Sequence, residues 1–137
     1  STLKADGADP RSYMHALDGK LYFRGYNGSE DELYVYDPAA GTTAKVASAD
    51  INDGSYGTHP EYMHALDGKL YFRGNEGSEY ELYAYDPDTD ATAKVDGADI
   101  SNILGGTDPS YMHALDGKLY FESRGELYVY FPDDLTV

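Results

Sequence analysis

The stretch Tyr-Met-His-Ala-Leu-Asp-Gly-Lys-Leu-Tyr-Phe occurs three times without a change, at Tyr13–Phe23, Tyr62–Phe72 and Tyr111–Phe121. Successive copies begin 49 residues apart. In each copy, Asp-Gly separates two short runs of mainly apolar and aromatic residues. This dipeptide is typical of a type I′ hairpin turn, because both central residues of that turn need a positive φ. The repeat therefore predicts three identical antiparallel hairpins.

A two-residue turn also predicts the pairing within the hairpin, with Leu17 opposite Lys20, His15 opposite Tyr22 and Met14 opposite Phe23. One face of the hairpin then carries only apolar side chains: Met14, Ala16, Leu21 and Phe23. The other face carries an amphipathic set: Tyr13, His15, Leu17, Lys20 and Tyr22. Because neither face is plainly polar, we expect a sheet that is covered on both sides.

Each repeat contains signals for two more strands. Glu32–Asp37 (ELYVYD) and Thr43–Val46 (TAKV) follow the first hairpin, and Glu81–Asp86 and Thr92–Val95 follow the second. The third repeat has only the first of these strands, Glu126–Phe131, before the sequence ends. The start of the chain supplies the missing element, since STLKADGAD at 1–9 matches TAKVDGAD at 92–99.

This order of strands predicts an all-β fold made of β-propeller blades, each a four-stranded antiparallel sheet, with a displaced terminal strand. A single repeat domain is expected. Its parts are a closing strand at 1–9, blade 1 at 10–58, blade 2 at 59–107, and blade 3 at 108–137, which lacks its last strand. The strand YMHAL would lie innermost in each blade.

Three blades cannot close a ring, because propellers have four to eight. The simplest remedy is a homodimer with six blades, which follows the closed two-fold symmetry of most homo-oligomers. The N-terminal strand of each subunit would complete the third blade of the other, next to the strand that carries Leu127 and Val129. That closing strand consists of Thr2, Leu3, Lys4 and Ala5. The alternative is a monomeric β-trefoil, which also has three repeats of four strands and commonly binds sugars. A trefoil would not need the separate N-terminal closing strand, so that strand favours the propeller.

The residues also resemble known repeat families. DGKLYFRG, then ELYVYDP and TTAKV, is similar to a kelch-type blade and to bacterial repeats with an ELW-x-x-DGT signature, with Tyr34, Tyr83 and Tyr128 in place of the tryptophan. The resemblance covers nearly the whole chain and implies a propeller. The kelch double glycine is reduced to Arg24-Gly25 and Arg73-Gly74, and it is lost at Glu122-Ser123.

The repeats are closer to one another than natural repeats usually are. Eleven unchanged residues in three copies indicate recent duplication or deliberate construction. The first connection between repeats is also shorter than the later ones, with 9 positions from Lys4 to Tyr13 against 17 from Lys45 to Tyr62. The sequence therefore suggests a fragment or an engineered protein.

Composition excludes several classes of function. The chain has 25 acidic and 10 basic residues, for a net charge of −15, which disfavours nucleic acids and anionic membrane surfaces as partners. Cysteine is absent, so disulfides and thiol chemistry are not available. No apolar run approaches the length of a membrane span. We expect a soluble protein, with the compartment left open and an extracellular one favoured for a natural protein.

Three histidines, His15, His64 and His113, occupy equivalent positions on the strand expected to be innermost. In a six-bladed dimer they would form a ring of imidazoles, which is a candidate metal or anion site. The preferred interpretation is a packed histidine that pairs with a tyrosine across the hairpin. His59 lies outside the hairpins, and we expect it to be solvated.

The long connections at 47–61 and 96–110 are candidate ligand-binding loops, because ligands often bind to loops on one face of such a scaffold. They offer four polar or aromatic candidates for a lectin-like or protein-binding site: Tyr56, His59, Asn102 and Asp108. Asp86-Pro-Asp88-Thr-Asp90 begins like a calcium loop, but the glycine and glutamate that such a loop needs at its sixth and twelfth positions are absent. A turn is expected there, and no metal or cofactor is predicted.

No catalytic motif is present: the chain has no G-x-S-x-G, no P-loop, no dinucleotide fingerprint and no H-E-x-x-H. The sequence thus favours a non-enzymatic, symmetric scaffold, half of a propeller that assembles with itself. The alternative is a binding module for a carbohydrate or a protein, which would use the long loops.

Overall fold

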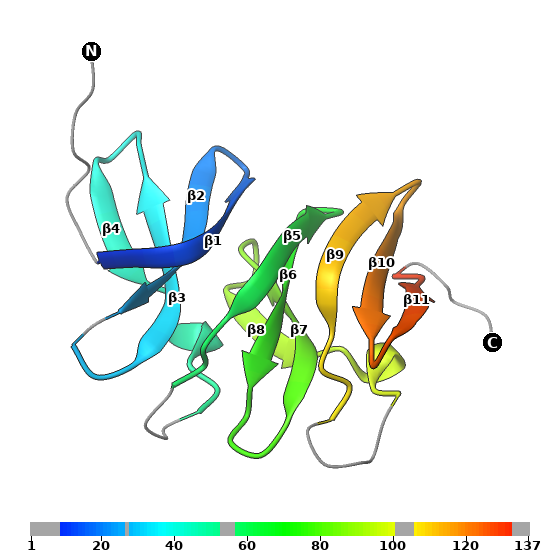
Figure 1. Cartoon of the computed structure of the whole chain (residues 1–137). Coiled ribbons are helices and arrows are strands. Elements are labelled where there is room, and N and C mark those ends of the chain that lie inside the picture. The colour runs from blue at the N-terminus through cyan, green and yellow to red at the C-terminus, as the bar shows by residue number, and fades with distance from the viewer. Residues whose placement is uncertain (1–8, 27, 53–56, 101–105, 133–137) are drawn as a thin grey trace.

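The computed structural model describes residues 9–26, 28–52, 57–100 and 106–132 of the 137-residue chain. These residues form three antiparallel sheets and two short 3-10 helices (Figure 1). The first sheet contains β1 (Asp9–Leu17), β2 (Lys20–Tyr26), β3 (Asp31–Asp37) and β4 (Thr42–Lys45). The second contains β5 (Glu61–Leu66), β6 (Lys69–Asn75), β7 (Tyr80–Asp86) and β8 (Ala91–Lys94). The third contains β9 (Ser110–Leu115), β10 (Lys118–Ser123) and β11 (Glu126–Tyr130). The all-β class is confirmed.

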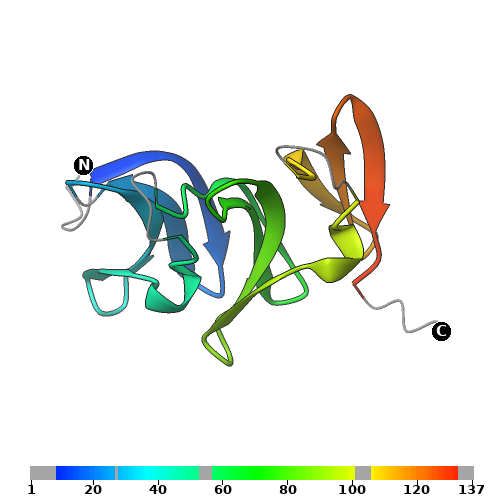
Figure 2. The ribbon, with the colours of Figure 1, turned by 90° about the horizontal axis from the view of Figure 1, so that it is seen from below.

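Within each sheet the strands pair in chain order, so each repeat folds as a meander. The 3-10 helices η1 (Ala47–Ala49) and η2 (Asp96–Ala98) follow β4 and β8 and lead the chain toward the next sheet. The three sheets succeed one another side by side, as the view from below in Figure 2 also shows. Among the described residues no helix has the length and apolar character needed to cross a membrane.

The hairpin turns have the predicted geometry. Asp18 and Gly19 have φ of 52° and 76°, and the Asp-Gly pairs of the other two copies repeat these values within a few degrees. The register of β1 and β2 places His15 opposite Tyr22 and Leu17 opposite Lys20, as expected. The same pairs recur in the second and third sheets.

The first strand of each sheet, β1, β5 or β9, contains a β-bulge that corrects one predicted pair. The register with β2 shifts between Ser12 and His15, so Met14 does not join Phe23 in the regular ladder. The residue at the shift, Tyr13, has a φ of 62°, and Tyr62 and Tyr111 are also left-handed in their strands. A bulge adds one residue to one strand and turns its side chains. Counting outward from the hairpin turn could not predict this extra residue.

The apolar core lies between the sheets. We call the contact between the first and second sheets the first joint, and the contact between the second and third sheets the second joint. At the first joint, the buried side chains of the first sheet are Leu17, Tyr22, Leu33, Val46 and Ala49, and those of the second sheet are Met63, Leu70, Phe72, Tyr83 and Tyr85. The second joint repeats this pattern 49 residues later, with Leu66, Tyr71, Leu82, Val95 and Ala98 against Met112, Leu119 and Phe121. The second sheet is therefore covered on both faces, as the amphipathic hairpins predict.

A close approach inside each sheet explains the glycine after the repeated arginine. A Cβ on Gly25 would lie 2.6 Å from the ring of Tyr34, and one on Gly74 would lie 2.8 Å from the ring of Tyr83. These separations are well inside van der Waals contact, so only glycine lets the ring of β3 or β7 lie against β2 or β6. The glycine of the kelch-like motif thus has a packing role here.

Candidate functional site

Strands β1, β5 and β9 bring the three repeated histidines together. The ring centroids of His15 and His64 are 4.6 Å apart, and those of His64 and His113 are 5.5 Å apart. Burial lowers the pKa of His15 and His64, and the neighbouring imidazoles His15 and His113 lower the pKa of His64 further. Each histidine also lies opposite a tyrosine in its hairpin, as predicted. The row is therefore a set of packed imidazoles that favours the uncharged form in its first two members.

A row of tyrosines runs beside the histidines. The ring centroids of Tyr13 and Tyr62 are 5.2 Å apart, and those of Tyr62 and Tyr111 are 5.3 Å apart. Burial raises the pKa of the Tyr62 hydroxyl, and the hydroxyls of its two neighbours raise it further. All three tyrosines in this row have a positive φ, because each stands at the bulge of its strand. Innermost strands thus contact one another through ring contacts rather than through backbone pairing.

Two of the predicted loop residues have the same structural position. His59 and Asp108 are 49 residues apart, both have a left-handed φ, and both precede an innermost strand. His59 Nε2 lies 3.1 Å from Arg24 Nη1, and the carboxylate of Asp108 accepts from Arg73. Each loop residue therefore contacts the repeated arginine of the preceding sheet.

The expectation that His59 is solvated was wrong. Its side chain is 24% exposed, and its Nδ1 lies 3.2 Å from the Asp31 carboxylate. Burial is the largest cause that lowers the pKa of His59, followed by the positive charge of Arg24, while Asp31 acts in the opposite direction. The sequence signal was available, because His59 and Asp108 both stand directly before a proline at equivalent positions.

Glu61 connects the arginines of two sheets. Its Oε2 accepts from Arg24 Nη1 at 3.0 Å, and its Oε1 accepts from Arg73. The guanidinium groups lie over tyrosine rings, with Arg24 5.3 Å from the centroid of Tyr13 and Arg73 5.1 Å from that of Tyr62. This polar network links the first sheet to the second. In the third repeat, Ser110 and Glu122 replace the glutamate and the arginine and contact each other at 3.3 Å.

The other two loop candidates, Tyr56 and Asn102, lie outside the described residues. A ligand site on the long loops therefore stays a prediction. What the described part shows is that His59 and Asp108 already contact charged partners, which reduces the number of polar groups that this surface offers to a ligand.

The acidic segment Asp86–Asp90 forms a turn, as predicted. Asp86 Oδ1 accepts the backbone N–H of Asp88 at 3.0 Å. Asp90 Oδ1 accepts from the Tyr85 hydroxyl at 3.0 Å and from the Ser48 hydroxyl at 3.2 Å. Two of its three aspartates thus satisfy the protein's own donors, and they raise no expectation of a metal ion.

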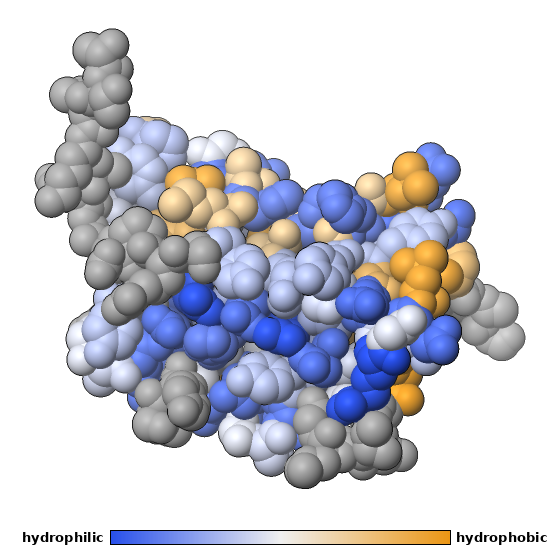
Figure 3. All heavy atoms as spheres, in the orientation of Figure 1, coloured by the Kyte–Doolittle hydropathy of each residue, from blue (hydrophilic) through white to orange (hydrophobic). Residues whose placement is uncertain are grey.

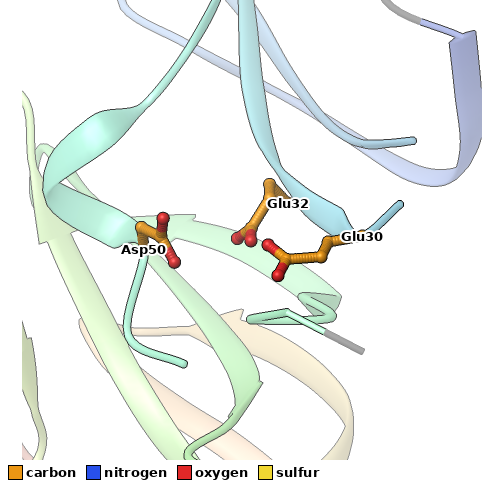
Figure 4. A group of neighbouring side chains, drawn as sticks. All are labelled: Glu30, Glu32 and Asp50. Carbon is orange, nitrogen blue, oxygen red and sulfur yellow. The ribbon is translucent and has the colours of Figure 1, made fainter. Parts of the chain in front are cut away.

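A different carboxylate cluster, which sequence analysis missed, has the geometry of a cation site. Oxygens of Glu30, Glu32 and Asp50 all lie within 4.8 Å of one another (Figure 4). Glu30 directly precedes β3, Glu32 is its second residue, and Asp50 directly follows η1, so the chain path rather than the sequence spacing brings them together. The recurrence of Glu79, Glu81 and Asp99 at equivalent positions is the one signal that could have pointed to the cluster.

The third sheet presents an apolar surface, which we call the trailing face and define by Leu115, Tyr120 and Leu127. Leu127 is 75% exposed, whereas the equivalent Leu33 and Leu82 at the two joints are each 1% exposed. Leu115 is 58% exposed, although both of its equivalents are buried. Figure 3 shows hydrophobic residues gathered at this end of the molecule.

The first sheet presents the complementary surface at the opposite end. We call it the leading face and define it by Met14, Leu21 and Phe23, of which Met14 is exposed, Leu21 is half-buried and Phe23 is buried. Met14 is 55% exposed, whereas Met63 and Met112 are buried at the joints. Figure 3 also shows hydrophobic residues, in orange, on the surface near β1 and β2. In the part of the chain that the structure describes, each end of the row of sheets therefore lacks the second neighbouring sheet that the middle sheet has.

The comparisons with known proteins assign no family. No model of a protein family matches this chain, and no significantly similar protein is found among the curated ones. The resemblance of the repeat to kelch-type blades and to repeats with the ELW-x-x-DGT signature stays a prediction.

Proposed function

We propose that this chain is half of a six-bladed β-propeller, a non-enzymatic scaffold that closes its ring as a homodimer. The observation that carries the proposal is the pair of open faces, each of which repeats a surface that is buried at an internal joint. In this arrangement the trailing face of each subunit packs against the leading face of the other. The two contacts are related by a two-fold axis, so the assembly is closed.

The internal joints support this pairing. At the first joint, Leu33 of one sheet and Met63 of the next belong to one buried cluster. Leu127 and Met14 are the equivalents of these two residues, and both are exposed. Burying a leucine or methionine contributes about 1.5–3 kcal/mol relative to leaving it in water. Several such side chains at each of two joints give dimerisation a substantial apolar driving force.

The open edge of β11 supports an exchanged strand. In the first two sheets the last strand pairs with the third, with Lys45 opposite Tyr34 and Lys94 opposite Tyr83. Carried over to the third sheet, this register puts Lys4 of the other subunit opposite Tyr128. The closing strand, which comprises Thr2, Leu3, Lys4 and Ala5, lies outside the described residues. Within the described part, β11 has a partner strand on one side only.

Strand pairing also favours the propeller over the β-trefoil. Each described sheet consists of the strands of a single repeat, and the repeats meet through side chains. Separate sheets in chain order are the arrangement of propeller blades. The resemblance of the repeat to kelch-type blades points the same way.

Solution mass tests the proposal. We expect light scattering to give twice the 15.1 kDa of the chain, with dimerisation strengthened by salt because two chains of net charge −15 repel each other. Leu127→Asp places a charge in the proposed interface and is expected to give a folded monomer. Ala40→Asp adds the same charge at an exposed turn and should leave the dimer intact. A wild-type monomer at high salt, or a dimer unaffected by Leu127→Asp, would contradict the ring.

A further inference from the structure

We propose that Glu30, Glu32 and Asp50 bind one hard divalent cation, of the Ca²⁺ class, where the first sheet meets the connection to the second. Calcium in proteins takes oxygen ligands at about 2.3–2.6 Å, so oxygens on opposite sides of one ion lie about 5 Å apart. The three carboxylates meet this requirement, since their oxygens lie within 4.8 Å of one another. Figure 4 shows the paired glutamates, with Asp50 across from them.

The second observation is a buried oxygen without a partner. Glu32 is 1% exposed, and its Oε1 accepts the backbone N–H of Thr58 at 3.3 Å. Its Oε2 has no hydrogen-bond partner, and neither has Asp50 Oδ1. A buried carboxylate that lacks a partner is costly. A bound cation would satisfy both oxygens at once.

The nearby lysine neutralises only part of this charge. Lys45 Nζ contacts Asp50 Oδ2 at 2.8 Å, and this contact is the largest cause that raises the pKa of Lys45. The charge of Glu32 also raises the pKa of Lys45, so one ammonium acts on both Asp50 and Glu32. Three carboxylates and one ammonium give a net charge near −2 when all are ionised, which matches a divalent ion.

The connection after Asp50 packs tightly against the cluster. Gly57 has a φ of +66°, and a Cβ on it would lie 2.6 Å from Glu32 Oε2. The hydroxyl of Thr58 donates to the carbonyl of Ala49 at 2.8 Å and accepts from the N–H of Ile51 at 3.0 Å. These contacts bring the chain back over Glu32 and hold Asp50 next to it. The fold itself therefore holds the unpartnered Oε2 of Glu32 in place.

The buried glutamate recurs in the second repeat, although among the described residues only Glu30, Glu32 and Asp50 bring three carboxylates within 4.8 Å of one another. Glu81 is 1% exposed, its Oε1 accepts the N–H of Thr107 at 3.3 Å, and its Oε2 has no hydrogen-bond partner. Glu79 and Asp99 occupy the positions that correspond to Glu30 and Asp50. Recurrence in an independent copy argues that the buried glutamate belongs to the repeat unit. In the third repeat, Arg124 replaces the first glutamate.

A proton is the competing occupant. Burial, followed by the neighbouring carboxyl of Glu30 and then the charge of Asp50, raises the pKa of Glu32 to about 7, while the hydrogen bonds from Thr58 oppose this. The charged groups around Glu32 are Glu30, Asp50 and Lys45. Cation binding is therefore expected to strengthen as the pH rises above 7 and to weaken as the carboxyl is protonated.

The test is a calorimetric titration of the intact chain with CaCl₂ at pH 8, after treatment with a chelator, together with thermal melts. We expect saturable binding and a melting temperature about 5 °C or more higher when Ca²⁺ is in hundredfold excess over its dissociation constant. Lowering the pH to about 5.5 should weaken binding at least tenfold. Mg²⁺, which demands a smaller octahedral site, should bind more weakly.

Matched variants assign the binding to the cluster. Glu32→Gln should lower the stoichiometry by one ion and lose the corresponding thermal shift, whereas Asp88→Asn, at the acidic turn, should leave both unchanged. Should Glu32→Gln fail to fold, Glu30→Gln at the half-exposed edge of the cluster provides the same comparison. No heat and no thermal shift at pH 8 would overturn the proposal, as would a Glu32→Gln or Glu30→Gln variant that binds like the wild type. All three ligands lie in one chain, so this result is independent of whether the ring forms.

Discussion

The segments Glu32–Tyr36 and Glu126–Tyr130 have the same five residues, Glu-Leu-Tyr-Val-Tyr, and opposite surroundings. In β3 the leucine is 1% exposed, and in β11 it is 75% exposed. β3 has a strand on each side and a second sheet against its face, whereas among the described residues β11 has a strand on one side and no sheet against the face that carries Leu127. The same five residues therefore form a strand in both places, and the neighbouring strand and sheet decide whether that strand is core or surface.

This contrast predicts the largest effect. Leu33→Ala removes a fully buried side chain from the first joint, so we expect it to lower the free energy of unfolding by about 2–5 kcal/mol. Leu127→Ala should cost almost nothing in dilute protein, where the chain is a monomer. At concentrations that favour the ring, its cost should approach that of Leu33→Ala. Chemical denaturation of both variants at low and high protein concentration measures the difference. A cost for Leu127→Ala that stays near zero at every concentration would mean that this leucine never enters a joint.

The glutamate of the same segment predicts a pH effect of intermediate size. The raised pKa of Glu32, about 7 against an ordinary value near 4.5, means that its contribution to stability is complete below pH 4.5 and is lost as the pH rises to 7. Without divalent ions, Glu32→Gln should therefore gain about 1–3 kcal/mol relative to the wild type between these pH values.

Glu126 is the natural control for that measurement, because the same four residues follow it and it is exposed. Glu126→Gln should follow the wild-type curve in chelator at low protein concentration. Thermal denaturation from pH 4 to 8 compares the three proteins. If Glu32→Gln tracks the wild type across this range, burial does not hold the Glu32 carboxyl in its neutral form.

The smallest effect is expected where the repeats do not differ. Gly68 and Gly117 are both at the hairpin turn, with φ of 76° and 75°, and a Cβ at either site would meet no atom within 4 Å. Substitution by alanine costs only the backbone strain of a positive φ, about 1 kcal/mol. Gly68→Ala and Gly117→Ala should therefore destabilise their hairpins equally in equilibrium denaturation. Unequal costs would show that the incomplete third sheet alters even its local turn.

Features that depend on local chemistry could be predicted from the sequence. The Asp-Gly turns, the register of His15 with Tyr22 and the two-sided sheets follow from turn geometry and alternation, and the structure confirms them. Features that depend on the path between repeats could not. The bulge at Tyr13 adds a residue that no count from the turn reveals, and the partners of His59 come from strands about 30 residues away.

The candidate cation cluster was missed for the same reason. Glu32 and Asp50 come from different elements, and only the return of the chain through Thr58 brings the two side chains to one place. The acidic run Asp86–Asp90 looked more like a metal loop in the sequence, yet Asp86 and Asp90 accept hydrogen bonds from their own turn and its surroundings. Proximity in the sequence was a poor guide to which carboxylates lack donors.

The two joints are built from equivalent residues, because the trailing surfaces of the first two sheets repeat each other, as do the leading surfaces of the last two. Such a unit is directional, because its trailing surface packs against the leading surface of the next unit and not against another trailing surface. A gene for it can lengthen by copying a segment of 49 residues, since each new copy arrives with both halves of the contact that it needs. Growth by duplication therefore requires no second mutation to create an interface. The near-identity of the three repeats agrees with such a route.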